Sequence, residues 1–374
     1  MTSEAPPVAE RLPLTNPFTA GDAPARSLNR VWLMELPGVP VEEGLLGRRA
    51  GEVLSTEAVR SLVRAAPLPL DPAAPNLLHR FDACFDDPQT RGPALAVAGI
   101  VGRRLAAYLL ALRRGDAANR AARPEWDDVH WAYWAAVERV VIGGGLLAGR
   151  LGEAAIAETR AFLAAANCDL RVERSPFGAA IALVGLARHA PPDARHMLLL
   201  DFGHTAVKCG LAAYHDGWLS QITIRPSLSA QGIVASSATA AERWERMAAL
   251  IVAEWTTAIP TDERARTSIG LALATHLEGG HPFPTDRGSY GQLRELAPNL
   301  AAFVGEELAR RLSPYHSVIL LHDGLAAAST RAGEPQTVVI TLGTFIGVGY
   351  TLGGEGLRPV SANVTVGQSE SSCF

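Results

Sequence analysis

Cysteine is scarce in this 374-residue sequence, and its four copies lie far apart, at Cys84, Cys168, Cys209 and Cys373. They form neither a C-x-x-C pair nor the ligand spacing of a zinc site. The ten histidines are scattered without pairs four residues apart. A metal cluster is therefore not expected, and a reducing cytoplasm is the economical location for widely spaced thiols.

A strong charge of either sign and an uninterrupted apolar span are also absent. The formal charge is -4, and the N-terminal "MTSEAPPVAERLPLTNPF" has neither the basic start nor the apolar core of a signal peptide. The most apolar long stretch, "LAVAGIVGRRLAAYLLALRR", is interrupted by Arg103 and Arg104, which predicts a buried helix and not a membrane span. Neither a nucleic acid nor a membrane is expected as a partner.

No G-x-x-x-x-G-K-[ST] motif occurs, which excludes a P-loop nucleotide site. The length suggests two lobes, each large enough to bury a core. In the second half, strand and helix patterns follow the order βββαβαβα. The segments are "MLLLDF", "AVKCGLAAY", "LSQITIR", "TAAERWERMAALIVAEWTTAI", "TSIGLALAT", "YGQLRELAPNLAAFVGEELARRL", "SVILLHD" and "GLAAAST".

A second copy of this order is found only when the two ends of the chain are joined. Its main segments are "TVVITLGT", "IGVGYTLG", "NRVWLMELPGV", "ERVVIGGG", "GEAAIAETRAFLAAA", "DLRVERS" and "GAAIALVGLAR". We therefore predict an α/β fold in which two βββαβαβα lobes flank a central cleft. Residues 1–190 would form most of one lobe, 197–335 would form the other, and 336–374 would return to complete the first.

The corner "DFGHTAVKCG" ends the first strand of the second-half lobe. Gly203 lacks a Cβ, so phosphate oxygens can approach backbone N–H groups there, and the hydroxyl of Thr205 can add a hydrogen bond. Asp201 is placed to hold Mg²⁺. A phosphate loop that includes His204 and Lys208 is one interpretation, and a plain hairpin is the other.

A second glycine-rich corner, "TLGTFIGVGY", lies at the matching place of the other lobe. Gly343, Gly347 and Gly349 recur across a predicted strand-turn-strand, which indicates a bulge or the close approach of another group. A flexible hairpin is the alternative. Together with Thr344, these glycines would face the first corner across a gap that suits a polyphosphate.

Three acidic residues are candidates for contact with a substrate. Asp323 ends an apolar strand and begins a helix of small residues, where Asp is a favoured N-cap. A carboxylate there can also accept the proton of an acceptor hydroxyl, as a phosphotransferase requires, and both interpretations stay open. Glu35 and Glu52 are possible substrate ligands, with surface carboxylates as the default interpretation.

The segment "VVIGGGLLAG" ends a strand in Gly143, Gly144 and Gly145. It matches the dinucleotide fingerprint G-x-G-x-x-A through Ala148, and Glu173 closes the following strand where a ribose ligand would lie. An NAD(P)-binding oxidoreductase is thus one alternative. A nucleoside lying on the glycine triplet is the interpretation that uses all the glycine corners.

These residues resemble the ROK family of sugar kinases and repressors, in the actin-like ATPase superfamily. Four segments carry the resemblance: residues 201–206 (D-x-G-G-T-K in the family), 322–327 (N-D-x-x-A-A), 342–349 (L-G-T-G-I-G-G-G) and 141–145 (V-x-G-G-G). The resemblance implies ATP and Mg²⁺ as cofactors and Asp323 as general base. It also places His322 where the family has a sugar-contacting Asn.

The order of these segments differs from that of the family, because the adenosine segment here precedes the phosphate loop. The sequence therefore resembles a circularly permuted member whose old ends are joined near "LARHAPPDARH". The family's sugar-contacting E-x-G-H is similar to residues 35–38, where the histidine is absent. Its cysteine-rich zinc segment is similar in place to "EEGLLGRRAG", which has no cysteine, so structural zinc is not expected.

Together these features predict an ATP- and Mg²⁺-dependent phosphotransferase that acts on a hydroxyl of a small sugar-like acceptor, as a homodimer. A non-catalytic sugar- or nucleotide-binding regulatory protein with a degenerate kinase site is a second hypothesis, because the acceptor side departs most from the family. No helix-turn-helix precedes the lobes, which disfavours a DNA-binding repressor.

Overall fold

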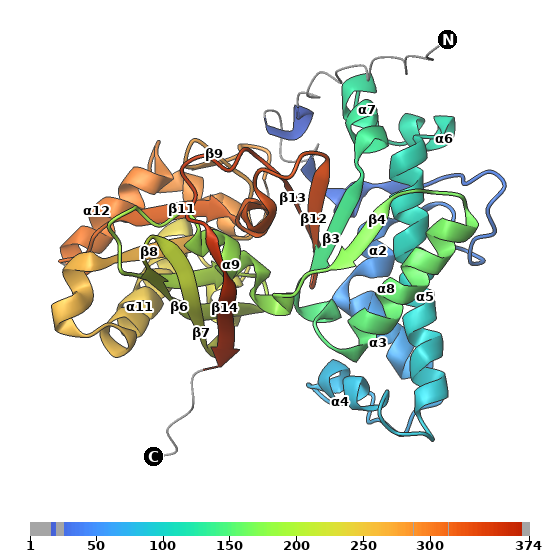
Figure 1. Ribbon diagram of the computed structural model, residues 1–374, viewed down its shortest axis with the longest axis horizontal. Helices are drawn as coiled ribbons and strands as arrows, with labels where there is room; N and C mark the ends of the chain where they lie inside the picture. Colours follow the sequence, from blue (N-terminus) through green and yellow to red (C-terminus); the bar gives the residue numbers. More distant parts are fainter. Residues whose placement is uncertain (1–15, 20–25, 287, 313, 369–374) are drawn as a thin grey trace, which may run out of the picture.

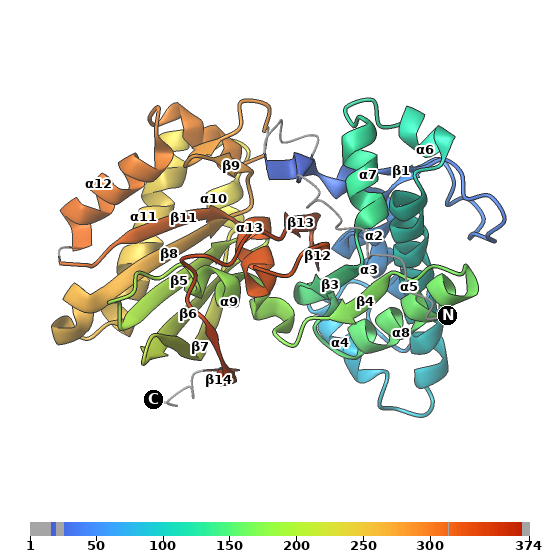
Figure 2. The ribbon, with the colours of Figure 1, turned by 45° about the horizontal axis from the view of Figure 1, so that its top comes forward.

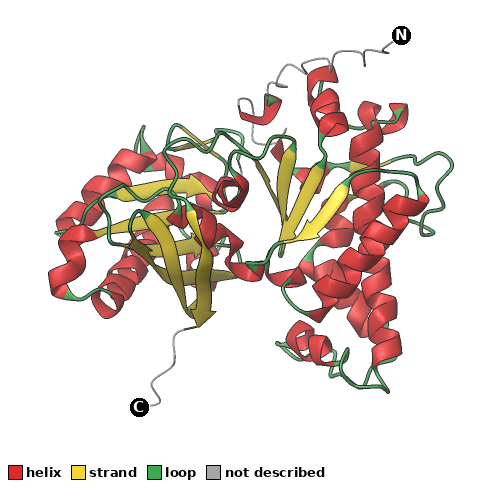
Figure 3. Cartoon of the chain, in the orientation of Figure 1, coloured by secondary structure: helices red, strands yellow, loops and turns green. Residues whose placement is uncertain are grey.

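The computed structural model describes residues 16–19, 26–286, 288–312 and 314–368. These residues form an α/β structure in two halves, each built around one β-sheet that is covered by helices (Figure 1 and Figure 3). The predicted α/β class is confirmed at this level.

The larger sheet has six strands. In hydrogen-bonding order they are β11 (Val318–His322), β8 (Thr267–Leu273), β5 (His196–Phe202), β6 (Ala206–His215), β7 (Trp218–Ser229) and β14 (Val360–Gln368). β5, β8 and β11 are parallel, whereas β6 is antiparallel to both β5 and β7. The carboxyl ends of the three parallel strands therefore lie at one edge of the sheet.

The smaller sheet repeats this pattern with four strands. They are β4 (Arg171–Arg174), β3 (Arg139–Gly143), β12 (Thr337–Leu342) and β13 (Ile346–Tyr350). The first three are parallel, and β13 pairs antiparallel with β12. Both sheets thus contain three parallel strands followed by an antiparallel one, although the smaller sheet combines segments from two distant parts of the chain.

Helices pack on these sheets in layers (Figure 2). Long helices cover the outer faces: α11 (Ala240–Ala258) and α12 (Leu300–Leu312) on the larger sheet, α5 (Arg91–Arg114) and α8 (Arg150–Ala165) on the smaller one. Two short helices, α9 (Ile181–Ala187) and α13 (Asp323–Ala328), lie between the sheets. Their side chains share one apolar cluster with the larger sheet and another with Val141 and Val339 of the smaller sheet.

Shorter elements complete the described structure. The strands are β1 (Trp32–Leu33), β2 (Arg48–Arg49), β9 (Leu277–Glu278) and β10 (His281–Pro282). The α-helices are α2 (Ala50–Leu54), α3 (Thr56–Ala65), α4 (Leu77–Ala83), α6 (Ala117–Ala121), α7 (Asp128–Ala136) and α10 (Gln231–Val234). The 3₁₀ turns are η1 (Pro17–Thr19), η2 (Leu28–Arg30), η3 (Gly145–Leu147), η4 (Gly178–Ala180), η5 (Thr261–Arg266), η6 (Tyr290–Glu295) and η7 (Ser329–Arg331).

The most apolar stretch of the sequence forms α5. Among the described helices it alone is long and apolar enough to cross a membrane, yet 67% of its apolar window is buried inside the protein. The two arginines that interrupt this stretch pair with carboxylates, Arg103 with Glu158 at 2.8 Å and Arg104 with Glu42 at 2.6 Å. The prediction of a buried core helix is confirmed.

The two central helices approach each other closely at Gly185 of α9. A Cβ on Gly185 would lie 1.6 Å from the carbonyl oxygen of Ala326 in α13. Gly185→Ala is therefore expected to lower the free energy of unfolding by about 1–2 kcal/mol, because overpacking costs more than the stability that alanine normally adds over glycine in a helix. Urea unfolding followed by tryptophan fluorescence measures this change.

Gly305→Ala is the matched control. Gly305 also lies inside a helix, α12, but a Cβ there meets no heavy atom within 4 Å. The same substitution should therefore raise the free energy of unfolding by about 0.5–1 kcal/mol through helix propensity alone. If both variants changed stability in the same direction, the close packing of α9 on α13 would be contradicted.

The third strand predicted at "NRVWLMELPGV" does not join the smaller sheet. Only Trp32 and Leu33 are extended, and they pair with Arg48–Arg49 in a separate ladder. At the start of β13, the side-chain amide of Asn29 accepts the N–H of Ile346 at 2.9 Å and donates to its carbonyl at 2.8 Å. A side chain thus satisfies backbone groups that the predicted strand was expected to pair.

The C-terminal segment departs from the predicted division in which residues 336–374 complete the first lobe. Residues 360–368 form β14, which pairs in parallel with β7 of the larger sheet. Just before it, the guanidinium of Arg358 donates to the carbonyls of Pro192 (2.9 Å) and Ala194 (2.8 Å). The chain therefore crosses back and links the two halves.

Candidate functional site

One pocket of about 930 Å³ is lined by residues of both halves. It contains most of the residues that the sequence singles out: Asp201, Gly203, His204, Thr205, Lys208, Gly343, Thr344, Gly347, Gly144, Gly145, His322 and Asp323. They lie mostly at the carboxyl ends of β3, β5, β11 and β12 and in the turns that follow. Parallel pairing brings these distant segments to one edge of each sheet.

The two glycine-rich turns meet inside this pocket. The first comprises residues 203–205, between β5 and β6, and the second comprises residues 343–345, between β12 and β13. The hydroxyl oxygens of Thr205 and Thr344 lie 2.6 Å apart. The corners therefore face each other as the sequence predicts, but they touch instead of flanking an open gap. A polyphosphate would bind between them only after this hydroxyl contact opens.

Both turns carry unused backbone donors. The N–H groups of residues 204–205 and 343–345 donate no hydrogen bond to any residue that the structure describes. The N–H of Gly203, in contrast, is used within its own turn, where it lies near the carbonyls of Asp201 (3.1 Å) and Ala206 (3.2 Å). Five free donors on two touching turns suit the binding of anionic oxygens.

Asp201 is buried next to the only lysine among the 34 lysine and arginine residues of the sequence. Its Oδ2 accepts a hydrogen bond from Lys208 Nζ at 2.7 Å. Burial lowers the pKa of Lys208, but the charge and hydrogen bond of Asp201, together with Asp323, outweigh burial and raise that pKa above its usual value. A compact, charged ammonium therefore lines the same pocket as the two turns.

Asp201 also fits as a ligand of Mg²⁺. Its second oxygen, Oδ1, accepts no hydrogen bond from the described residues, and the residue lines the pocket. In nucleotide sites Mg²⁺ is held by one or two carboxylates together with phosphate oxygens and water, so a single protein carboxylate is compatible with it. Within the described ranges, no group of three His, Cys, Asp or Glu side chains is placed to hold a metal ion by itself.

Asp323 begins α13 and lines the pocket near these turns. Its Oδ1 accepts the N–H of Gly324 at 2.7 Å and lies 3.0 Å from Nε2 of His322, whereas Oδ2 has no partner among the described residues. Burial raises the pKa of Asp323, but the charge and hydrogen bond of His322, with smaller contributions from His276 and the Gly324 N–H, lower it overall. The carboxylate is therefore ionised and keeps one oxygen free, as a proton acceptor requires.

The glycine triplet is divided between packing and the pocket. A Cβ on Gly143 would lie 2.9 Å from Ile181, so Gly143 packs against α9 and does not line the pocket. Gly144 has a φ of +95°, and a Cβ there would meet the Leu342 carbonyl at 2.4 Å, whereas Gly145 has open space around its Cβ position. Gly144 is thus required by its backbone conformation and its contact with Leu342, whereas Gly145 leaves room for a flat group such as a nucleoside base.

Asp82 of α4 lies at the N-terminus of α8, next to this triplet. Its Oδ1 accepts the N–H of Leu151 at 2.9 Å, and its carboxylate packs against Gly149, the N-cap residue, which has no side chain to cap the helix. In a dinucleotide fold, this helix end binds the pyrophosphate. A carboxylate at the same place repels phosphate, which argues against NAD(P) and favours an uncharged group at this end of the pocket.

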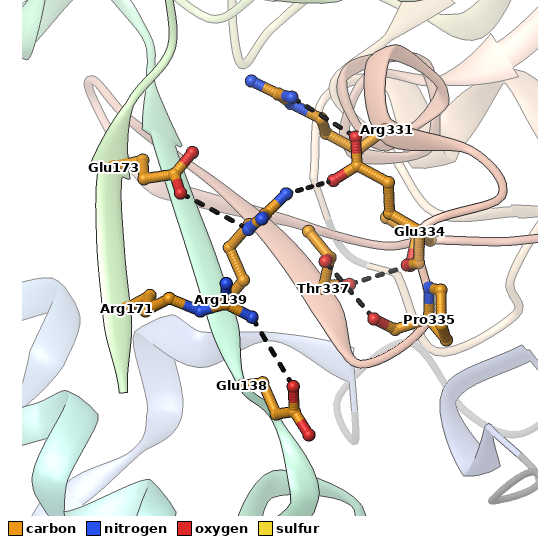
Figure 4. A network of polar contacts seen from close by, with 9 residues as sticks. Glu138, Arg139, Arg171, Glu173, Arg331, Glu334, Pro335 and Thr337 are labelled. Atoms are coloured by element: carbon orange, nitrogen blue, oxygen red, sulfur yellow. Dashed lines mark hydrogen bonds and ion pairs between the residues drawn. The ribbon is translucent and has the colours of Figure 1, made fainter. Parts of the chain in front are cut away.

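Glu173, the ribose ligand expected for a dinucleotide, does not line the pocket. It pairs with Arg139 at 3.4 Å, and Arg139 pairs with Glu334 at 2.8 Å (Figure 4). Arg139 is the first residue of β3, whereas the pocket lies beyond the carboxyl end of that strand. Glu173 therefore belongs to an ion-pair network, which also argues against the dinucleotide alternative.

Glu35 and Glu52, predicted as substrate ligands, are absent from the pocket lining. Oε1 of Glu35 accepts the N–H of Ala118 at 2.7 Å, in the first turn of α6. Oε2 of Glu52 accepts hydrogen bonds from the side chain of Arg48 and the N–H of Arg49, at the start of α2. Each carboxylate instead stabilises a helix N-terminus.

Sequence reasoning missed the loop that follows β8. Asp286 organises it: Oδ2 accepts from Thr275 Oγ1 (2.7 Å) and the N–H of His276 (3.1 Å), and Oδ1 accepts the N–H of Gly288 (2.7 Å). The ring of His276 lies 4.3 Å from that of His322, and burial lowers the pKa of His276 to about 3. One sequence signal could have identified this loop: it is rich in Pro and Gly and directly follows a strand of the parallel part of the sheet, where ligand sites form.

Comparisons with known proteins assign no family to the chain. No protein-family model matches the sequence, and no curated protein matches it. Function must therefore be inferred from the residues of the site.

Proposed function

We propose that this chain is an ATP-dependent phosphotransferase that phosphorylates a hydroxyl of a small carbohydrate-like acceptor. One observation carries the proposal: a single pocket contains both an ionised carboxylate and free backbone donors. The carboxylate is Asp323, which has one oxygen without a partner among the described residues, and the free N–H groups belong to the turns at residues 203–205 and 343–345. Such a pocket can accept a proton and hold a polyphosphate, which are two requirements of phosphoryl transfer.

In this proposal the two substrates occupy different parts of the pocket. The nucleoside would lie on Gly144 and Gly145, where Asp82 disfavours phosphate, and the phosphates would extend along the two turns. The acceptor would lie beside Asp323 and His322, at the carboxyl end of β11. In this orientation the γ-phosphoryl group would lie at the end of the pocket that Asp323 lines.

In the transfer, Asp323 Oδ2 would accept the proton of the acceptor hydroxyl while that oxygen bonds to the γ-phosphorus and ADP leaves. Lys208 and the free N–H groups would hold phosphate oxygens. Mg²⁺, held by Asp201 and the phosphates, offsets phosphate charge when it is bound. Closure of the two halves would exclude water and favour the acceptor over hydrolysis.

The similar strand order of the two sheets, with α9 and α13 between them, supports an actin-like architecture. The smaller sheet takes β12 and β13 from the C-terminal part of the chain and β3 and β4 from the first half. This order supports a circularly permuted relative of the ROK kinases.

A non-catalytic binding protein is the second candidate function. The contact between Thr205 and Thr344 closes the space in which phosphates would lie. In addition, neither Glu35 nor Glu52 lines the pocket, so it lacks the two glutamates expected to bind a sugar. These two observations favour a chain that kept the cleft without efficient chemistry.

Acceptor-dependent ADP release separates these functions. The purified protein would be incubated with Mg-ATP and a panel of sugars, amino sugars and polyols, while the binding of ATP and NAD(P)H is measured by calorimetry. ADP that forms only with an acceptor, and that disappears when Mg²⁺ is chelated, supports the phosphotransferase. Binding of ATP without turnover supports the regulatory protein, and tight binding of NAD(P)H would overturn both.

A further inference from the structure

His322 lies between β11, an edge strand of the larger sheet, and helix α13. It ends β11, is the N-cap residue of α13, and lines the pocket with a side chain that is 14% exposed. Its Nε2 lies 3.0 Å from Asp323 Oδ1. Because a carboxylate only accepts hydrogen bonds, Nε2 is the donor wherever the two side chains are hydrogen-bonded.

The orientation of the carboxylate follows from the partners of one of its oxygens. Oδ1 of Asp323 accepts the N–H of Gly324 at 2.7 Å and lies 3.0 Å from Nε2 of His322, whereas Oδ2 has no partner among the described residues. With Oδ1 held at two points, the free oxygen keeps one direction relative to the pocket. Without the imidazole, only the adjacent backbone N–H would hold the side chain.

The imidazole is itself held in place. The ring of His276 lies 4.3 Å away at an interplanar angle of 33°. On the other side, a Cβ on Gly324 would lie 2.6 Å from Cε1 of His322, so only glycine leaves room for the ring. His276 is neutral because burial lowers its pKa to about 3.

We propose that His322 is a positioning residue for Asp323: it donates from Nε2 to Oδ1 and so aims Oδ2 at the hydroxyl of the acceptor. The proposal rests on the phosphotransferase function above. During transfer the hydroxyl proton passes to Oδ2, the acceptor oxygen bonds to the γ-phosphorus, and ADP leaves with the electrons of the broken P–O bond. The proton then leaves Asp323 for solvent, and His322 keeps its own proton throughout.

Glutamine and alanine at position 322 test this role. The amide nitrogen of Gln can take the place of Nε2, whereas Ala removes the donor. We expect His322→Ala to lower kcat by on the order of 10-fold to 10²-fold with little change in the Kd of ATP, and His322→Gln to restore most of the loss. The acid limb of the pH profile should move to higher pH in His322→Ala, because Asp323 loses the interactions that lower its pKa.

The other titratable groups that interact with this carboxylate are His276 from the loop after β8, Lys208 from β6, His204 from the first turn and Tyr290 from η6. They remain in every variant, so a difference between Gln and Ala reports on position 322. His316→Gln is the matched control, because His316 pairs with Asp193 at 2.8 Å outside the pocket. It should leave kcat and KM unchanged.

Equal losses in the Gln and Ala variants, or a higher KM for the acceptor with unchanged kcat, would overturn the positioning role. If the wild type forms no ADP, the proposed function fails, but two measurements still decide the role of His322. ¹⁵N NMR of labelled histidine should show the Nε2–H tautomer, and ¹³C NMR of labelled aspartate should show a higher pKa for Asp323 in His322→Ala than in His322→Gln. The opposite tautomer or equal pKa values would refute the proposal.

Discussion

Replacing Asp323 with asparagine is expected to lower acceptor-dependent ADP formation by on the order of 10²-fold or more. The amide keeps the shape of the carboxylate, and its carbonyl oxygen can still accept the Gly324 N–H. It cannot take a proton from the acceptor hydroxyl at neutral pH. The fold and the Kd of Mg-ATP should therefore stay close to those of the wild type, as measured by calorimetry alongside a coupled ADP assay.

Asp193→Asn is the control for this substitution. Asp193 also pairs with a histidine, His316, at 2.8 Å, but its side chain is 76% exposed and does not line the pocket. Its turnover should match that of the wild type. If Asp323→Asn kept its turnover, Asp323 would not be the base, and if it lost ATP affinity to the same extent as turnover, the carboxylate would act in nucleotide binding instead.

The central part of the site follows from the sequence through one local signal and one rule of topology. Asp201 lies near the end of the buried strand β5, Asp323 follows the half-buried strand β11, and Gly343 follows the buried strand β12. Since parallel strands place their carboxyl ends at a common edge, these residues can be predicted to gather without knowledge of their side-chain contacts. The sequence did not predict the direct contact between Thr205 and Thr344, because it depends on how closely the halves approach.

The substrate side could not be predicted in the same way, because an isolated carboxylate has several uses. Glu35 caps a helix whose first turn lies 83 residues further along the chain, at Ala118. Asn29 satisfies the edge of β13 through Ile346, which is 317 residues away. Such partners are set by tertiary packing, so no local pattern distinguishes these side chains from ligands of a substrate.

Element boundaries show the same division between local and distant causes. The helix predicted over residues 290–312 is divided into η6 and α12, with Pro298 between them. This break could have been predicted, because proline disfavours the helical conformation of the residue before it. The pairing of β14 with β7 could not be predicted from the sequence. The strands that precede β14 in the chain, β12 and β13, belong to the smaller sheet, whereas β14 joins the larger one.

Lys208 provides the second large expected effect. Lys208→Met should lower the free energy of unfolding by about 2–3 kcal/mol, because it leaves the buried carboxylate of Asp201 without its cation. The double variant Asp201→Asn/Lys208→Met should recover most of this loss, because it removes both charges. Urea unfolding of the four proteins of this cycle gives the coupling energy, and a double variant less stable than Lys208→Met would contradict the pairing.

The same ion pair can be measured directly, because Lys208 is the only lysine in the sequence. A ¹³Cε-lysine label gives one side-chain signal, and its titration should give a pKa above the ordinary 10.5 in the wild type. Asp201→Asn should lower that pKa. Burial disfavours the charged ammonium, and in this variant the charge of Asp201 no longer opposes the effect of burial.

A raised pKa in the folded state means that the pair stabilises the protein fully below pH 10.5 and loses this contribution as the pH rises through the folded pKa. The stability difference between wild type and Lys208→Met should therefore shrink above pH 10.5, and a titration unaffected by Asp201→Asn would mean that the ammonium does not face this carboxylate in solution.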